Sequence, residues 1–180
     1  ADMTQLSDIK NVIDKTIEKF GRIDIVVNNA GQSAAGSFET VSDNAWEADL
    51  DLKFYAAIRM SRAAIPYMKR SGGGRIINVT NLGGKAPGAS SMPTSVSRAA
   101  GIALTKAMSK DLAAANILVN TVCIGLIKSG QHERRLEALV KAGQHITLEN
   151  HYKQLGGDGR VPLGRVGEAE EAGDVIAFLA

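Results

Sequence analysis

The side chains of Asn81, Thr94 and Arg98 are suited to contact a polar oxygen of a substrate. The Asn81 amide can donate a hydrogen bond to a carbonyl. Thr94 and Arg98 stand four residues apart, so a helix would place the hydroxyl and the cation on one face. Asp51 adds a carboxylate, which we expect to pair with Arg98. Neither an aliphatic hydroxyl nor a guanidinium titrates in a useful range, so these residues predict oxygen binding without an obvious proton donor.

The composition is that of an ordinary folded protein. The 180 residues suffice for one domain with a hydrophobic core, and 44% of them are hydrophobic and 22% charged. The net charge of +2, without a basic cluster, argues against a nucleic-acid surface. No apolar stretch approaches the ~20 residues of a membrane span, and the polar, acidic start is unlike a signal peptide. The lone Cys123 forms no internal disulfide, so we expect a reducing, cytoplasmic location.

Helical periodicity dominates two early segments. Apolar residues recur at three- and four-residue steps after Ser7, and again after Ser42 and Asp43, which indicates amphipathic helices that begin at these capping residues. Gly21 ends the first helix, and Pro66 is expected to bend or break the second. Further helices are expected at about 95–115 and 133–142 and from 168 onward.

Three short runs rich in β-branched residues separate these helices, at 23–27, 75–79 and 117–122. Continuous apolar runs of this kind indicate strands that are buried on both faces. No two of them are close enough for a hairpin. The alternation therefore predicts an α/β fold, in which a parallel sheet carries helices on both faces.

Short motifs follow these strands at regular places. Asn28-Asn29-Ala30-Gly31 ends the first strand, Asn81 ends the second, and Ile124-Gly125-Leu126-Ile127-Lys128-Ser129 follows the third. Thr94-Ser95-Val96-Ser97-Arg98 opens the helix after the second strand. The order and spacing of these segments resemble the short-chain dehydrogenase/reductase family over nearly the whole chain. The resemblance implies a Rossmann-like doubly wound parallel sheet, in a single partial domain over residues 1–180.

The resemblance also implies elements that this sequence lacks. In the family, two βα units with a glycine-rich phosphate loop precede the acidic turn that Asp2 resembles, which corresponds to about 60 residues at ~30 per unit. A last strand would follow residue 180. We therefore expect a chain without the family's first βαβ units and last strand.

Four catalytic positions of the family hold other residues here. The resemblance places the family's Ser at Asn81, its Tyr at Thr94, its Lys at Arg98 and its supporting Asn at Asp51. In the family the Tyr gives the proton and the Lys lowers the pKa of that Tyr. The implied cofactor is NAD or NADP, with no metal. The residues implied to bind the cofactor are Asp2, Met3, Asn28, Ala30, Gly31, Thr94, Arg98, Gly125, Ile127 and Ser129.

Three functions stay open. The first is a divergent NAD(P)-dependent oxidoreductase acting on a carbonyl or alcohol of a small-molecule substrate. The second is a catalytically inactive homologue that binds nucleotide or serves as a regulatory or oligomer subunit, and the third is non-redox chemistry such as elimination. In the first, the proton donor could be relocated to one of six residues: Ser90, Ser91, Ser95, His145, His151 and Tyr152. The substrate loop, at about 126–160, is too mixed to identify a substrate.

The resemblance implies self-association as well. In the family, the helices that correspond to 43–70 and 95–115 form the main subunit interface. Trp46, Phe54 and the alanines between Ala99 and Ala107 place apolar or small side chains on more than one face of these helices. We therefore expect a homodimer or homotetramer.

Overall fold

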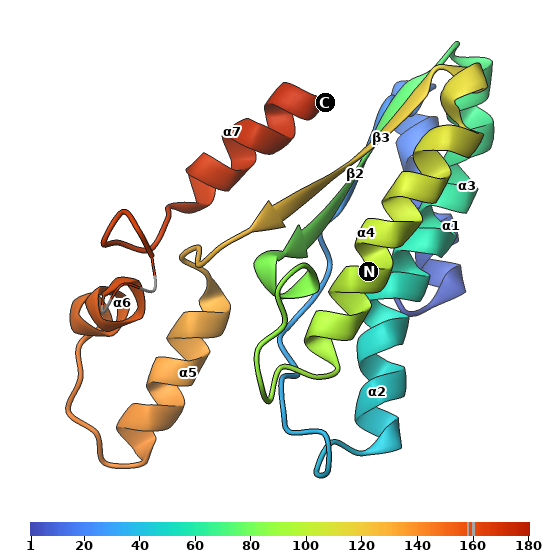
Figure 1. Cartoon of the computed structure of the whole chain (residues 1–180). Helices are drawn as coiled ribbons and strands as arrows, with labels where there is room; N and C mark the ends of the chain where they lie inside the picture. The colour runs from blue at the N-terminus through green and yellow to red at the C-terminus, as the bar shows by residue number, and fades with distance from the viewer. Residues whose placement is uncertain (158, 160) are drawn as a thin grey trace. The chain divides into compact units, whose positions relative to one another are not determined.

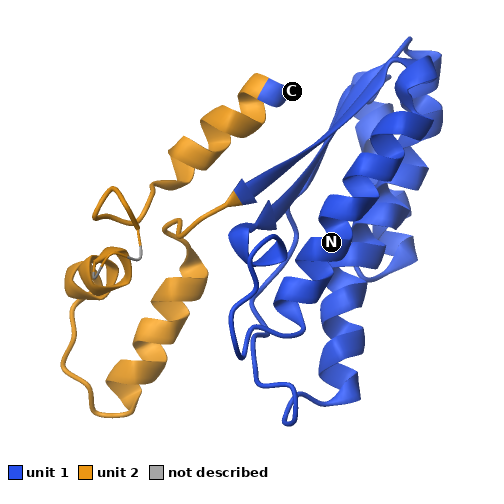
Figure 2. Cartoon of the chain, in the orientation of Figure 1, with its two compact units in different colours: residues 1–123, 179–180 blue, residues 124–178 orange. Residues whose placement is uncertain are grey.

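The computed structural model describes residues 1–157, 159 and 161–180. The chain forms two compact units, one of residues 1–123 with 179–180 and the other of residues 124–178 (Figure 2). Each unit is considered separately. The single domain expected over residues 1–180 stays a prediction.

The first unit is built on a three-stranded sheet. Its strands β1 (Ile25–Asn28), β2 (Gly74–Asn81) and β3 (Ile117–Ile124) lie in the order β1-β2-β3. β1 and β2 pair in parallel with Val26 opposite Ile76, and the arrows of β2 and β3 point the same way in Figure 1. The predicted parallel sheet is confirmed. β1 and β2 end at one edge of the sheet, so the residues that follow these two strands gather there.

Helices α1 (Leu6–Phe20), α3 (Ala56–Arg70) and α4 (Thr94–Asp111) pack on one face of this sheet (Figure 1). Their apolar residues meet the inward side chains of the strands in a single core, which contains Ile13, Ile23, Val26, Ala64, Met68, Ile76, Ile117 and Val119. Alternation along the strands turns Ile25, Val27 and Leu118 to the other face, where they are 41–47% exposed. The second helical layer that was expected is therefore not among the described elements of this unit.

One long helical column joins β1 to β2. It consists of α2 (Asp43–Leu50), the π-helical turn η1 (Asp51–Tyr55) and α3. The break expected at Pro66 is wrong, because α3 runs through it. Ala64 and Met68, both fully buried, anchor the helix on either side of Pro66, so packing compensates for the missing backbone donor. The irregular turn lies instead at η1, and π turns of this kind are frequent at functional sites.

The N-terminus of α2 allows a direct test of helix capping by Ser42. Ser42 accepts a hydrogen bond from the backbone N–H of Ala45 at its Oγ, as predicted for an N-cap. Replacement of Ser42 by Ala should lower the free energy of unfolding by about 1 kcal/mol. Replacement of Ser42 by Asp should retain most of the parent's free energy of unfolding, since Asp also caps helices well. Equal stability of Ser42→Ala and the parent in urea unfolding would contradict this assignment.

The second unit is mainly helical. It contains α5 (Gly130–Lys141), α6 (Leu148–Gly156) and most of α7 (Ala169–Leu179). α5 was predicted, whereas α6 was not. Thr147 caps α6 by accepting from the backbone N–H of Asn150. A parallel bridge between Ile127 and Gly167 and an ion pair between Lys128 and Glu168 tie the two ends of this unit together.

Candidate active site

Thr94 stands at the first residue of α4, with its hydroxyl buried at the centre of a polar cluster. Its Oγ1 accepts from the backbone N–H of Ala34 at 2.9 Å and from Lys53 Nζ at 3.0 Å. Thr94 Oγ1 also lies 3.4 Å from Asp49 Oδ1, to which it donates. The hydroxyl is therefore held in one orientation by groups from three segments of the chain.

Lys53 and Asp49 form a buried ion pair beside this hydroxyl. Each side chain is only 1% exposed. Ser97 Oγ donates to the second carboxylate oxygen of Asp49 at 2.6 Å, so both oxygens are bonded. Burial lowers the pKa of the Lys53 ammonium, although the hydrogen bond and the charge of Asp49 oppose this effect. Arg98 adds a smaller lowering effect on the pKa of Lys53 by charge repulsion. Lys53 is therefore a better proton donor than an ordinary lysine.

Arg98 extends from the same helix face toward the ends of β1 and β2. Its Nη1 donates to the backbone carbonyl of Val79 at 2.7 Å. A Cβ added at Gly31 would lie 2.6 Å from Arg98 Nη2, so only glycine lets this turn approach the guanidinium so closely. Burial lowers the pKa of Arg98, against the attraction of Asp49, but a guanidinium keeps its proton. A fixed positive charge therefore stands beside the Asn28–Gly31 turn.

Asn81 ends β2, as predicted, and its side chain is not saturated. Its Oδ1 is buried and has no hydrogen-bond partner among the residues that the structure describes. Arg98 Nε is likewise buried and has no hydrogen-bond partner among these residues. Buried polar atoms of this kind are costly unless another molecule completes their hydrogen bonds. The two atoms offer an acceptor and a donor to a polar ligand.

Asp51 lies elsewhere. Its Oδ1 pairs with Arg59 Nη1 at 2.5 Å, and Arg59 also donates to the backbone carbonyl of Thr4 at 3.3 Å. The expected pairing of Asp51 with Arg98 is therefore wrong. Asp51 and Lys53 stand two residues apart in the π-helical turn η1, so their side chains leave nearly opposite sides of it. Lys53 reaches the site and Asp51 does not.

Lys53, Asp49 and Ser97 were not predicted as site residues from the sequence. One feature could have found the first two, because an Asp four residues before a Lys forms a favourable helical pair. That pattern is common on solvated helix surfaces. Its burial depends on packing against α4, which the spacing alone does not reveal.

Several of the residues expected to bind a cofactor gather at β1. Met3, Asn28 and Ala30 line one small cavity of about 60 Å³, and Lys53 lines it too. The Asn28 amide donates to Ser61 and to Asn78, which fixes the turn after β1 on the sheet and on α3. Asp2 accepts from the backbone N–H and the hydroxyl of Thr4, and these bonds lower the pKa of its carboxyl group. The structure thus brings Met3, Asn28, Ala30 and Lys53 together.

The remaining expected positions divide between the two units. Gly125, Ile127 and Ser129 belong to the second unit, and their contact with a nicotinamide stays a prediction. Of the possible relocated donors, Ser91 bonds to Gly88 and to Ser95 in the first unit, while Ser90 is exposed. His145 is exposed in the second unit, and His151 and Tyr152 lie inside its helical hairpin.

Comparison with known proteins identifies the family. The sequence model described as short chain dehydrogenase matches residues 1–139. The chain belongs to the short-chain dehydrogenase family. It is 31% identical over 179 residues to the 3-oxoacyl-[acyl-carrier-protein] reductase FabG of Thermotoga maritima, covering 99% of this chain and 67% of that protein.

Solved structures of the same family resemble this chain closely. A short chain oxidoreductase from Pseudomonas aeruginosa PAO1, described as containing an atypical catalytic center, matches in its apo form with a TM-score of 0.88 and 32% identity, over 100% of this chain and 68% of that one. Its NADPH-bound form matches with a TM-score of 0.87 and 31% identity, over 99% and 66%. The chain therefore spans about two thirds of the length of these relatives.

Proposed function

We propose that this chain carries the site of an NAD(P)-dependent oxidoreductase that interconverts a carbonyl and an alcohol in a small-molecule substrate. One observation supports the proposal most strongly: the hydroxyl of Thr94, at the position that the resemblance assigns to the family's tyrosine, accepts a hydrogen bond from the buried ammonium of Lys53. A hydroxyl coupled to a desolvated lysine can pass a proton that the hydroxyl alone would not release.

The residues present fit a nicotinamide nucleotide. Asn81 Oδ1 and Arg98 Nε lack hydrogen-bond partners within the described part of the chain, and both suit a polar ligand. Met3, Asn28 and Ala30 would hold its adenosine side, whereas Arg98 would face its charged or polar groups. When bound, NAD or NADP supplies or accepts the hydride. The NADPH-bound state of the Pseudomonas relative supports this assignment.

The protein's own residues would then manage the substrate oxygen. The Asn81 amide would donate a hydrogen bond to the carbonyl. The Thr94 hydroxyl would exchange its 3.4 Å contact with Asp49 for a hydrogen bond to the same carbonyl oxygen, and would give it the proton as negative charge develops there. Lys53 would return a proton to Thr94 through their hydrogen bond. Arg98 would stabilise the charge without exchanging a proton. In the oxidation direction, the proton would travel the opposite way.

Turnover of NADH and NADPH against a panel of aldehydes, ketones and alcohols tests the proposal, with nucleotide binding measured in parallel. We expect consumption of one nucleotide with at least one carbonyl. Nucleotide binding without turnover would favour a catalytically inactive homologue that regulates a partner or subunit. Conversion of a substrate without any change in the nucleotide would favour elimination chemistry.

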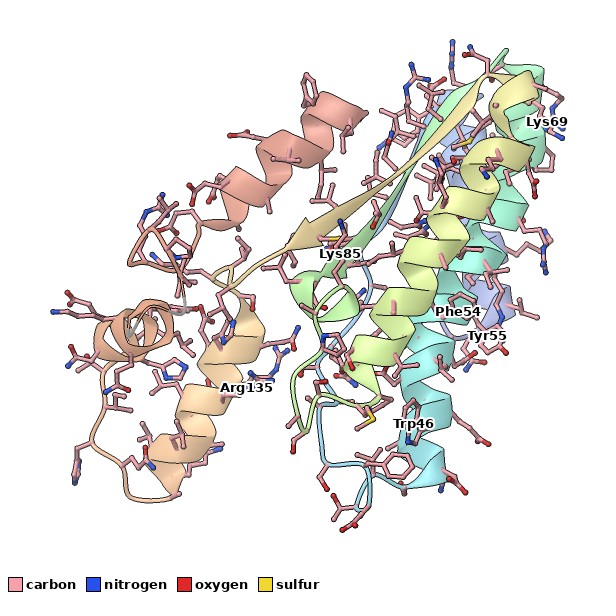
Figure 3. The ribbon with its side chains drawn as sticks, in the orientation of Figure 1. Trp46, Phe54, Tyr55, Lys69, Lys85 and Arg135 are labelled. Atoms are coloured by element: carbon pink, nitrogen blue, oxygen red, sulfur yellow. The ribbon has the colours of Figure 1, made fainter. Side chains whose placement is uncertain are left out.

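We also propose a homodimer or homotetramer in the cytoplasm. Val96, Ala99, Ala103 and Ala107 are exposed at helical spacing along α4, which forms a small apolar stripe. Figure 3 shows Trp46, Phe54 and Tyr55 along the neighbouring α2–η1 column, where Tyr55 is 47% exposed. None of the helices within the described ranges is long and apolar enough to cross a membrane.

The small apolar stripe on α4 predicts that a charged side chain introduced there would prevent self-association. Replacement of Ala103 by Glu should dissociate the oligomer, because close helix packing leaves no room or water for a carboxylate. Sedimentation at micromolar concentration should show a dimer or tetramer for the parent and a monomer for Ala103→Glu. Replacement of the exposed Lys106 by Glu is the matched control on the same helix. A monomeric parent would contradict the assembly.

A further inference from the structure

The hairpin of α5 and α6 contains three buried polar atoms without hydrogen-bond partners. They are His132 Nδ1, His151 Nε2 and Tyr152 Oη, and none has a partner among the residues described. The three rings form one cluster, with centroids 6.4 Å apart for the two histidines and 6.1 Å from each histidine to Tyr152. His151 is only 8% exposed. This cluster lies wholly within the second unit.

Such a cluster calls for a ligand. A buried polar atom that lacks a partner costs stability, and native proteins rarely place several together unless water or another molecule bonds to them. An apolar residue at any of the three positions would fill the hairpin without that cost. The helices therefore carry polar side chains where packing alone would favour apolar ones.

An open cavity adjoins the cluster at Tyr152. It measures about 600 Å³ and is lined by Lys128, Ser129, Glu133, Leu148, Glu149 and Tyr152. That volume suits a small organic molecule. The phenol of Tyr152 thus belongs both to the cluster of unpartnered atoms and to the wall of the cavity.

The charges of the cavity disfavour an anion. Among the described residues of its wall, Glu133 and Glu149 contribute two carboxylates, and Lys128 is the one cation, which Glu168 engages at 2.5 Å. Lys128 also lies over the Tyr152 ring, 5.6 Å from its centroid. Carboxylates accept hydrogen bonds from hydroxyl groups, so the wall suits a neutral ligand that carries several of them.

The imidazoles suit the same kind of ligand. Burial lowers the pKa of His132, and the charges of Arg135 and His151 lower it further, so the ring is neutral at neutral pH. A neutral imidazole has one donor and one acceptor, and a phenol has both functions, which matches hydroxyl and carbonyl groups. No group of three or more His, Cys, Asp or Glu residues that could hold a metal ion occurs in the described part of the chain.

We propose that the cavity at Tyr152 binds an uncharged, hydroxyl-rich small molecule of the sugar or polyol class, and that His132 and His151, whose rings contact Tyr152, respond to its binding. That this molecule is the substrate rests on the proposed function. That it binds in this cavity depends only on the residues of the second unit.

The three histidines of the protein provide the test, because each gives one imidazole signal in a spectrum of the full chain labelled at histidine. D-glucose, D-galactose and D-mannitol should each be titrated, beside D-gluconate as the anionic counterpart, without nucleotide. We expect the signals of His132 and His151 to shift with at least one neutral compound. The signal of His145, which is exposed, should stay in place.

Two single replacements sharpen the result. Tyr152→Phe removes one hydroxyl and keeps the ring, and it should weaken binding by about fivefold, the typical effect of one net hydrogen bond. His145→Gln is the matched control and should bind as the parent does. No shift with any neutral compound, equal shifts at His145, or tighter binding of D-gluconate would each overturn the proposal.

The test of this binding site can fail independently of the proposed function. Sugar binding without turnover of any carbonyl or alcohol would support this site and contradict the proposed oxidoreductase activity. Turnover without any shift of the His132 or His151 signals would support the oxidoreductase activity and contradict this site.

Discussion

Replacement of Asp49 by Ala should lower the free energy of unfolding by about 3–5 kcal/mol, the usual cost of removing one partner of a buried ion pair. The carboxylate accepts from Lys53 and from Ser97, and its side chain is 1% exposed. Without this carboxylate, the Lys53 ammonium stays buried and keeps its hydrogen bond to Thr94, which is a neutral hydroxyl. Chemical unfolding in urea measures the loss directly.

A double replacement separates the charge from the packing. Asp49→Leu together with Lys53→Met removes both charges and keeps apolar volume, so its free energy of unfolding should equal that of the parent or exceed it by about 1–4 kcal/mol. The double variant should therefore be more stable than Asp49→Ala. If both variants lose the same stability, the pair matters through its shape alone, and the electrostatic account is wrong. A folded double variant also serves to test activity without an unfolding artefact.

Much of the first unit could be predicted because its determinants are local. The β-branched runs at 23–27, 75–79 and 117–122 and the cap at Ser42 depend on residues near in sequence, and the structure confirms them. The Asn28–Gly31 turn follows β1 as predicted, because the end of the strand fixes where it begins.

The predictions that were wrong or missing concern helix register and the packing of separate helices. η1 is a π turn, so the resemblance that places the family's Asn at Asp51 does not reveal which nearby side chain faces α4. Burial then made a common helical pair, Asp49 and Lys53, into the centre of the site. In the second unit, α6 was missed, and with it the meeting of His132 with His151 across the hairpin. Contacts between separate helices have no counterpart in sequence spacing.

Replacement of Lys53 by Met should lower the rate of carbonyl reduction by about 10²-fold or more, the lower range for loss of a proton donor. Thr94→Val should have a similar effect, because it removes the hydroxyl through which Lys53 acts and keeps the side-chain shape. Lys106→Met, at an exposed position on α4, is the matched loss of a lysine and should leave the rate unchanged. If Lys53→Met reduces carbonyls as fast as the parent, Lys53 is not the proton source.

The pH profile tells a proton donor from a residue that only supports the fold. Burial lowers the pKa of Lys53 below its ordinary value of 10.5, so the ammonium loses its proton at a pH where exposed lysines keep theirs. Carbonyl reduction needs the protonated form, and kcat/KM should therefore fall as the pH rises through this lowered pKa. Alcohol oxidation needs the neutral form and should rise over the same range. Both limbs should vanish in the Asp49→Leu, Lys53→Met double variant, whereas a lysine that is only structural would leave the shape of the profile unchanged.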